Sequence, residues 1–167
     1  MNRKVSIAPM MDCTDRHDRY FLRLISKNTM LYTEMIVANA IIRGDKNFLL
    51  NFNNLEKPLA LQIGGSNPKE LAECAKIAEN YGYDEINLNL GCPSKKVQKN
   101  KFGACLIKEP NLVADCLNEM QSKTKLPVTV KTRVGYDDVE DYESLFNFVK
   151  LLKSTGVKTF IIHARKA

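Results

Sequence analysis

Strand-like segments alternate with amphipathic helical segments along this chain, and that alternation restricts the fold more than any other feature. The strand-like segments are residues 5–8, 31–34, 59–63, 85–90, 128–131 and 159–163. The helical segments between them are residues 15–27, 38–43, 68–81, 111–122 and 142–154. In the first helical segment one face is apolar and carries Tyr20, Phe21, Leu24 and Ile25. The alternation predicts an α/β fold with a parallel sheet and right-handed crossovers.

Two architectures share this alternation, an open doubly wound sheet and a (β/α)₈ TIM barrel. No GxGxxG motif follows the first strand, and Gly64-Gly65 follows the third without a phosphate-binding lysine. Polar residues instead recur at successive strand ends, which in a barrel meet at one rim. We therefore expect a TIM barrel, of which 167 residues provide about the first six β/α units.

Composition restricts the cellular setting more than the function. Lysine and arginine number 25 against 19 acidic residues, a net charge of +6 that favours an anionic partner. The five cysteines form no CxxC pair and no metal-like cluster with His17 or His163, so we expect reduced thiols and no metal. No segment approaches the roughly 20 apolar residues of a membrane span, and we expect a cytoplasmic protein without membrane contact.

One strand runs directly into a turn that presents a thiol. Ile86, Leu88 and Leu90 alternate with Asn87 and Asn89, so one face is apolar and the other carries two amides. The sequence Gly91-Cys92-Pro93 then ends the strand. β/α-barrel enzymes place their chemistry at this end of a strand. The alternative is a half-buried structural cysteine in a turn.

Other strand-end residues offer what a flavin requires, namely apolar contact with its ring, polar groups at its pyrimidine edge and a nearby cation. The candidates are Pro9, Met10 and Met11 for the ring, Gln62 for the pyrimidine edge and Lys131 for the charge. Each residue also has an ordinary structural interpretation: core methionines, a turn-capping glutamine, a solvated lysine, and at His163 a hydrogen-bonded core histidine. Their common position at strand ends favours the functional interpretation.

Several ordered motifs resemble the tRNA-dihydrouridine synthases, and some resemble subfamily A in particular. They are residues 9–12, 87–94, 102–106, 130–133 and 163–167, with 14–17 and 82–85 for the subfamily. The resemblance covers essentially the whole chain. It implies an FMN-binding barrel followed by a small helical domain, in an enzyme that is monomeric when complete. It also implies that NADPH provides the electrons for reduction of uridine to 5,6-dihydrouridine in the tRNA D-loop.

The resemblance also implies roles for individual residues. Cys92 matches the acid that protonates C5 of uracil, and a thiol can hold and release a proton at neutral pH. Asn89 would hold the uracil or the flavin edge, Arg165 would orient the substrate, and Glu34 is a weaker match to an orienting carboxylate. The positions that match flavin contacts are Pro9, Met10, Met11, Gln62, Lys131 and His163.

A lysine-rich segment follows the thiol directly. Lys95, Lys96, Lys99 and Lys101 fall within seven positions, and such a run is usually a solvated loop. Beside a site that receives tRNA, Lys95 and Lys96 would contact phosphates, with an affinity that falls as salt rises. These contacts would offset the cost of turning a base out of the folded tRNA.

The chain departs from this family at specific places. Cys13 stands where relatives usually have tryptophan, and Asp18 replaces a more usual apolar residue or cysteine. Relatives continue through two more barrel strands, which bind the FMN phosphate, and then into a helical tRNA-binding domain, and we expect both to be absent here. We therefore expect residues 1–167 to be the N-terminal part of the barrel domain, with weak FMN binding and little or no activity alone.

Two alternatives remain open from the sequence. Another FMN barrel oxidoreductase, similar to dihydroorotate dehydrogenase, would share the asparagine-rich strand and the Cys-Pro turn. It would have no use for the lysines at 95–101. The second alternative is an inactive fragment that retains only RNA binding through its basic surface.

Overall fold

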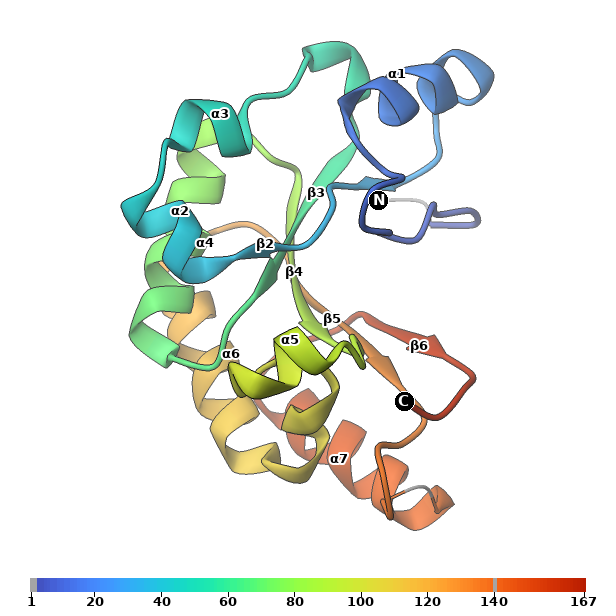
Figure 1. Cartoon of the computed structure of the whole chain (residues 1–167), viewed down its shortest axis with the longest axis vertical. Helices are drawn as coiled ribbons and strands as arrows, with labels where there is room; N and C mark the ends of the chain where they lie inside the picture. Colours follow the sequence, from blue (N-terminus) through green and yellow to red (C-terminus); the bar gives the residue numbers. More distant parts are fainter. Residues whose placement is uncertain (1–2, 140) are drawn as a thin grey trace.

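The computed structural model describes residues 3–139 and 141–167, in which a parallel sheet curls through part of a barrel (Figure 1). Its strands are β1 Leu31–Tyr32, β2 Ile36–Val37, β3 Leu59–Gly64, β4 Glu85–Leu90, β5 Val128–Arg133 and β6 Phe160–His163. The strand order is β1–β3–β4–β5–β6, with β2 also paired to β3, and all pairs are parallel. This topology confirms the predicted partial (β/α)₈ barrel.

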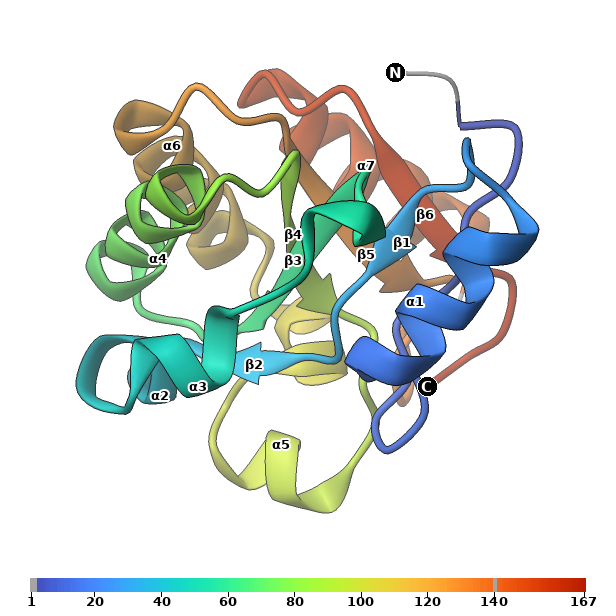
Figure 2. The same cartoon turned by 90° about the horizontal axis from the view of Figure 1, so that it is seen from above.

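Helices α2, α4 and α6 cover one side of the curled sheet, as both views show (Figures 1 and 2). The α-helices are α1 Arg16–Ile25, α2 Ala38–Arg43, α3 Lys46–Leu50, α4 Pro68–Tyr81, α5 Lys95–Lys99, α6 Pro110–Lys123 and α7 Tyr142–Ser154. Two 3₁₀ helices are η1 Asn54–Glu56 and η2 Gly103–Lys108. Within residues 3–139 and 141–167, no helix has the length and apolar character to cross a membrane.

The strand predictions hold for the central strands and fail at the start of the chain. Segment 5–8 forms only an isolated bridge between Ser6 and Met30. The predicted strand 31–34 is shortened to β1, and β2 follows it as a separate short strand. Between them, the hydroxyl of Thr33 accepts the backbone N–H of Gln62 at 3.0 Å. This side-chain bond takes the place of a ladder bond, so the strand is interrupted without leaving the sheet.

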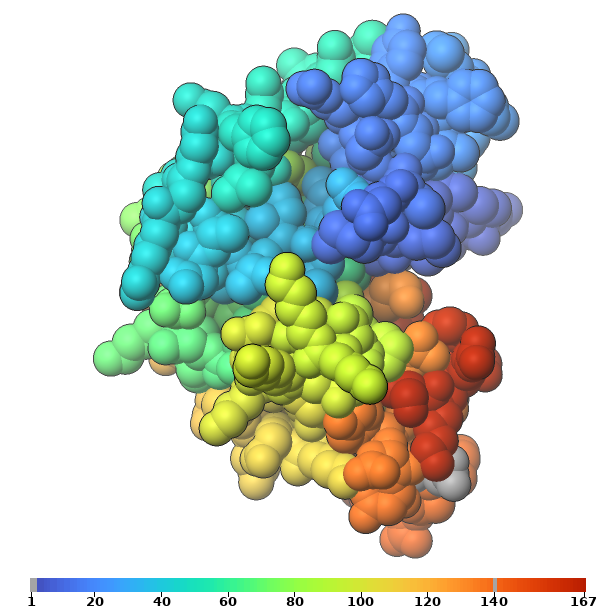
Figure 3. Space-filling model, viewed as in Figure 1, coloured from blue at the N-terminus to red at the C-terminus, as the bar shows by residue number. Residues whose placement is uncertain are grey.

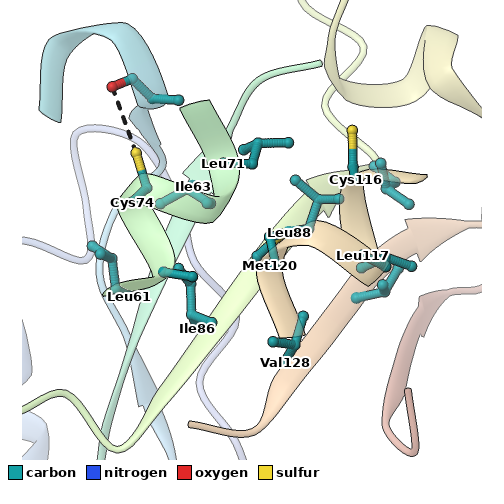
Figure 4. Close-up of a cluster of buried hydrophobic side chains, with 14 of the residues drawn as sticks. Leu61, Ile63, Leu71, Cys74, Ile86, Leu88, Cys116, Leu117, Met120 and Val128 are labelled. Atoms are coloured by element: carbon teal, nitrogen blue, oxygen red, sulfur yellow. Dashed lines mark hydrogen bonds between the residues drawn. The ribbon is translucent and has the colours of Figure 1, made fainter. Parts of the chain in front are cut away.

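The main apolar core lies between the outer face of the sheet and the helices α4 and α6 (Figure 4). Ile86 and Leu88 of β4 pack there against residues such as Leu71, Leu117 and Met120, all fully buried. These contacts involve the apolar residues of β4. The asparagines that alternate with them, Asn87 and Asn89, therefore face the inside of the barrel.

Helix α1 leaves its apolar face exposed and buries two arginines instead. Phe21 and Leu24 are exposed, whereas Arg19 and Arg23 are buried. The Nε of Arg19 donates to Glu56 Oε2 at 2.6 Å, and Arg23 donates to the carbonyl oxygen of Glu56 at 2.9 Å. A buried charge is tolerated when it is paired and hydrogen-bonded, so Glu56 determines which face of α1 turns inward.

We predict that Leu88→Ala lowers the free energy of unfolding by about 2–5 kcal/mol, because it leaves a cavity between β4 and the helices. The control is Leu24→Ala, since Leu24 is 69% exposed on α1 and should change stability by less than about 0.5 kcal/mol. Urea unfolding of both variants provides the measurement. Equal losses would contradict the orientation of α1 described above.

Candidate functional site

The inner face of the sheet is polar. Register places Gln62, Asn87 and Thr129 in one row across β3, β4 and β5, and Asn89 beside Lys131 one layer further along. The Nε2 of Gln62 donates to Asn87 Oδ1 at 2.8 Å, and Asn87 Nδ2 donates to Thr129 Oγ1 at 2.9 Å. Asn89 Nδ2 donates to Gln62 Oε1 at 2.9 Å. The two amides predicted for this face thus belong to one hydrogen-bonded layer.

A cavity of about 860 Å³ opens where these strands end. It brings together nine of the residues predicted from the sequence: Pro9, Met10, Met11, Gln62, Asn89, Cys92, Lys96, Lys131 and His163. Lys95 and Arg165 are exposed and lie outside its lining. Residues from six separate parts of the chain therefore share one space, which is the arrangement expected of a barrel mouth.

The turn that carries the thiol is held from several sides. Asn89 Oδ1 accepts the backbone N–H groups of Gly91 at 3.1 Å and Cys92 at 3.0 Å. Arg133 Nε donates to the Gly91 carbonyl at 2.8 Å. Gly103 has φ +76°, and a Cβ there would lie 2.8 Å from the Cys92 carbonyl oxygen. The half-buried Cys92 thiol is thus presented by a rigid turn.

The N-terminal loop brings two exposed methionines to the same cavity. Met10 N donates to Thr14 Oγ1 at 3.0 Å, and Asp12, in the left-handed region with φ 61°, donates its N–H to Glu34 Oε1 at 2.5 Å. Glu34 does not line the cavity. The structure therefore places Glu34 as an anchor for the loop that carries Met10 and Met11.

The cavity mouth is rich in cations. Lys131 is half-buried and forms no hydrogen bond or ion pair with the rest of the described chain. Desolvation, and then the charge of Arg133, lowers the pKa of Lys131 below its ordinary value. Desolvation and neighbouring cations, Arg133 first, also lower the pKa of His163. An electron-rich or anionic group placed beside Lys131 would relieve this unfavourable environment.

The lysine-rich segment predicted as a loop contains the short helix α5, anchored by the buried side chain of Val97. In the space-filling view this segment, drawn in yellow-green, lies at the front between the blue N-terminal and the orange-red C-terminal segments (Figure 3). Lys96 reaches the cavity lining, while Lys95, Lys99 and Lys101 are exposed. The basic segment therefore borders the cavity.

Some lining residues were not predicted as part of the site. Met35, Asn67, Phe102 and Arg133 lie in the lining. Arg133 is among the polar residues that the sequence places at strand ends, two residues after Lys131, but it was not predicted to have a role in the site. Phe102 could not have been predicted, because its place depends on Gly64: a Cβ there would lie 2.8 Å from the Phe102 ring.

The donor set of this cavity fits a flavin better than a metal ion. Across residues 3–139 and 141–167, no group of three or more His, Cys, Asp or Glu side chains could hold a metal. The cavity instead combines the apolar surface of Pro9, Met10 and Met11 with the amides of Gln62 and Asn89, beside a lysine. These are the contacts that an isoalloxazine ring and its pyrimidine edge require.

We predict that Lys131→Met raises the urea midpoint of unfolding at pH 7, because it removes a desolvated cation that has no partner in the part of the chain that the structure describes. The folded state holds this proton less tightly than the unfolded chain, so wild-type stability should rise with pH as Lys131 loses its charge. The difference in urea midpoint between the variant and the wild type should therefore become smaller at high pH. A lower midpoint for the variant at pH 7 would show that Lys131 has a partner in the fold.

Comparison with known proteins agrees with this geometry. The family model described as dihydrouridine synthase matches residues 6–167. The tRNA-dihydrouridine(20/20a) synthase of Synechocystis is 56% identical over 98% of this chain and 49% of its own length. Proteins with the same name from Vibrio parahaemolyticus and Escherichia coli K12 are 58% and 56% identical, each over 98% of the chain.

The chain spans about half the length of the curated relatives that it matches. The match runs through every element that lines the cavity, from the N-terminal loop to β6. This family match excludes the alternative that the chain is a dihydroorotate dehydrogenase-like protein. The chain belongs to the dihydrouridine synthase family.

Proposed function

We propose that this chain supplies the flavin and substrate half of a tRNA-dihydrouridine synthase, which reduces uridine in the tRNA D-loop with FMN and NADPH. The observation that carries the proposal is the single cavity shared by a thiol, two oriented amides and a lysine with no partner among residues 3–139 and 141–167. The names of the relatives indicate uridines 20 and 20a as the substrates. We assign residues 1–167 to the N-terminal part of the FMN-binding barrel domain.

The side chains of the cavity divide into flavin and substrate groups. Pro9, Met10 and Met11 would cover the flavin ring, and Gln62 would meet its pyrimidine edge. Lys131 and His163 would lie near the flavin N1 and C2 carbonyl, where a positive charge favours the reduced form. When bound and reduced by NADPH, FMN supplies the hydride for C6 of uracil.

Cys92 provides the proton that completes the reduction. Its thiol lies at the cavity lining, on a turn that Asn89 and Arg133 hold in place. A group fixed in this way is oriented before the substrate arrives, and this is the condition for efficient general acid catalysis. We propose that Cys92 Sγ donates its proton to C5 of the uracil and that Arg165 helps orient the base.

The basic segment 95–101 supports tRNA as the substrate. Its lysines are exposed beside the cavity, where the phosphates around an extruded base would lie. Turning a base out of a folded RNA costs a few kcal/mol, and phosphate contacts can offset that cost. A small-molecule substrate would not require such a surface.

In a longer form that includes the remaining segments of the relatives, we predict that Cys92→Ala abolishes most dihydrouridine formation, by about 100-fold or more, because it removes the proton donor. FMN affinity should change less than about threefold, because the thiol is not among the flavin contacts. The assays are dihydrouridine formation on unmodified tRNA and FMN titration by fluorescence. Unchanged turnover would show that another acid acts, and lost FMN binding would place Cys92 in the flavin site.

We predict that Lys95/Lys96/Lys99/Lys101→Ala weakens tRNA binding and makes the salt dependence of log Kd shallower. The matched control removes the same charge from exposed lysines far from the cavity: Lys123/Lys125/Lys153/Lys158→Ala. Filter binding at several salt concentrations distinguishes the two. If both variants change tRNA affinity and its salt dependence equally, segment 95–101 contributes only through the net charge of the protein.

A further inference from the structure

A chain of hydrogen-bonded side chains runs through the inside of the barrel beneath the cavity. At its lower end the buried carboxylate of Glu85 forms an ion pair with Arg3, and its Oε1 accepts the hydroxyl of Tyr32 at 3.1 Å. The same Oε1 accepts the Thr129 hydroxyl at 2.6 Å. Thr129 leads through Asn87 and Gln62 to Asn89, as described above. None of the lower residues lines the cavity.

The direction of every bond in this chain is determined by its two ends. A carboxylate paired with a guanidinium can only accept, so Thr129 must donate its one proton to Glu85. The Thr129 oxygen must then accept from Asn87 Nδ2, and Asn87 Oδ1 must accept from Gln62 Nε2. At the upper end, the backbone N–H groups of Gly91 and Cys92 can only donate, and they fix the oxygen of Asn89. The two ends impose the same direction.

This direction decides which atoms remain for a ligand. The Asn89 oxygen already accepts two N–H groups, so Asn89 can offer a ligand only its second N–H. Gln62 retains one N–H and one lone pair, because each of its two polar atoms uses one bond inside the chain. A rotated amide at either position would place two donors or two oxygens face to face.

We propose that Glu85, acting through Thr129 and Asn87, is a positioning residue that sets the orientation of the Gln62 amide and, together with the backbone N–H groups of Gly91 and Cys92, that of Asn89. Asn89 then presents a donor only and recognises a carbonyl oxygen of its ligand. Gln62 recognises an adjacent donor and acceptor pair. That the carbonyl belongs to flavin or uracil rests on the proposed function, whereas the orientation of the amides does not.

The test has a part that requires no ligand. Couplings across hydrogen bonds, measured by NMR on the deuterated and isotope-labelled wild-type chain, should join Gln62 Nε2 to Asn87 Cγ and Asn89 Nδ2 to Gln62 Cδ. Couplings in the opposite sense, from Asn87 Nδ2 to Gln62 Cδ or from Gln62 Nε2 to Asn89 Cγ, would overturn the proposal. Because the measurement uses the wild-type protein, it does not depend on how any variant folds.

A second part uses Thr129→Val, which keeps the shape of the side chain and removes the hydroxyl, beside Thr129→Ser, which keeps it. Thr129→Val should weaken FMN binding about tenfold and speed solvent exchange of the Gln62 and Asn89 amide protons. In Thr129→Ser, the FMN affinity and the amide exchange rates should both lie within about threefold of the wild-type values. Equal FMN affinity and equal amide exchange in all three proteins would overturn the positioning role. If no protein binds FMN but the predicted couplings are present, the proposed function fails and the amide orientation stands.

Discussion

A carboxylate buried inside a barrel must be paired and hydrogen-bonded, and the interior of this protein is arranged around that requirement at Glu85. Its partners come from three places far apart in the sequence: Arg3 from the N-terminal segment, Tyr32 from β1 and Thr129 from β5. Removal of one partner of a buried charge costs about 3–5 kcal/mol, so this cluster ties the first strand region to the middle of the sheet. The polar rows above it continue the same hydrogen bonding up to the cavity.

The outer face of the sheet therefore packs the core, and the inner face forms the site. The outer face buries Leu61, Ile63, Ile86 and Leu88 against α4 and α6 and supplies the apolar burial that holds the chain together (Figure 4). The inner face buries less apolar area, and its hydrogen-bonded polar side chains hold the site residues in defined orientations. Since β4 contributes to both faces, the same strand that anchors the core also places Asn89 under the thiol turn. The six residues of β4 thus contribute both to the stability of the fold and to the geometry of the site.

The sequence predicted features that depend on local alternation and missed those that depend on distant partners. The bounds of β4, α2, α4 and α7 were predicted correctly, because periodicity and residues such as Pro68 and Gly82 define them locally. The burial of Arg19 on α1 could not be predicted locally, because its partner Glu56 lies 37 residues away in the sequence. The interior role of Glu85 could not be predicted either, since Arg3 lies 82 residues away.

The oriented amides at the barrel mouth are proposed to bind a flavin, and an FMN titration can show whether they do. FMN would be added to the ¹⁵N-labelled chain while the side-chain amide signals of Gln62 and Asn89 are followed by NMR. We expect both signals to shift together and to saturate at one FMN per chain, while the distant Asn54 and Asn118 signals stay in place. Saturation that leaves Gln62 and Asn89 unchanged, or no saturable shift at all, would contradict the claim.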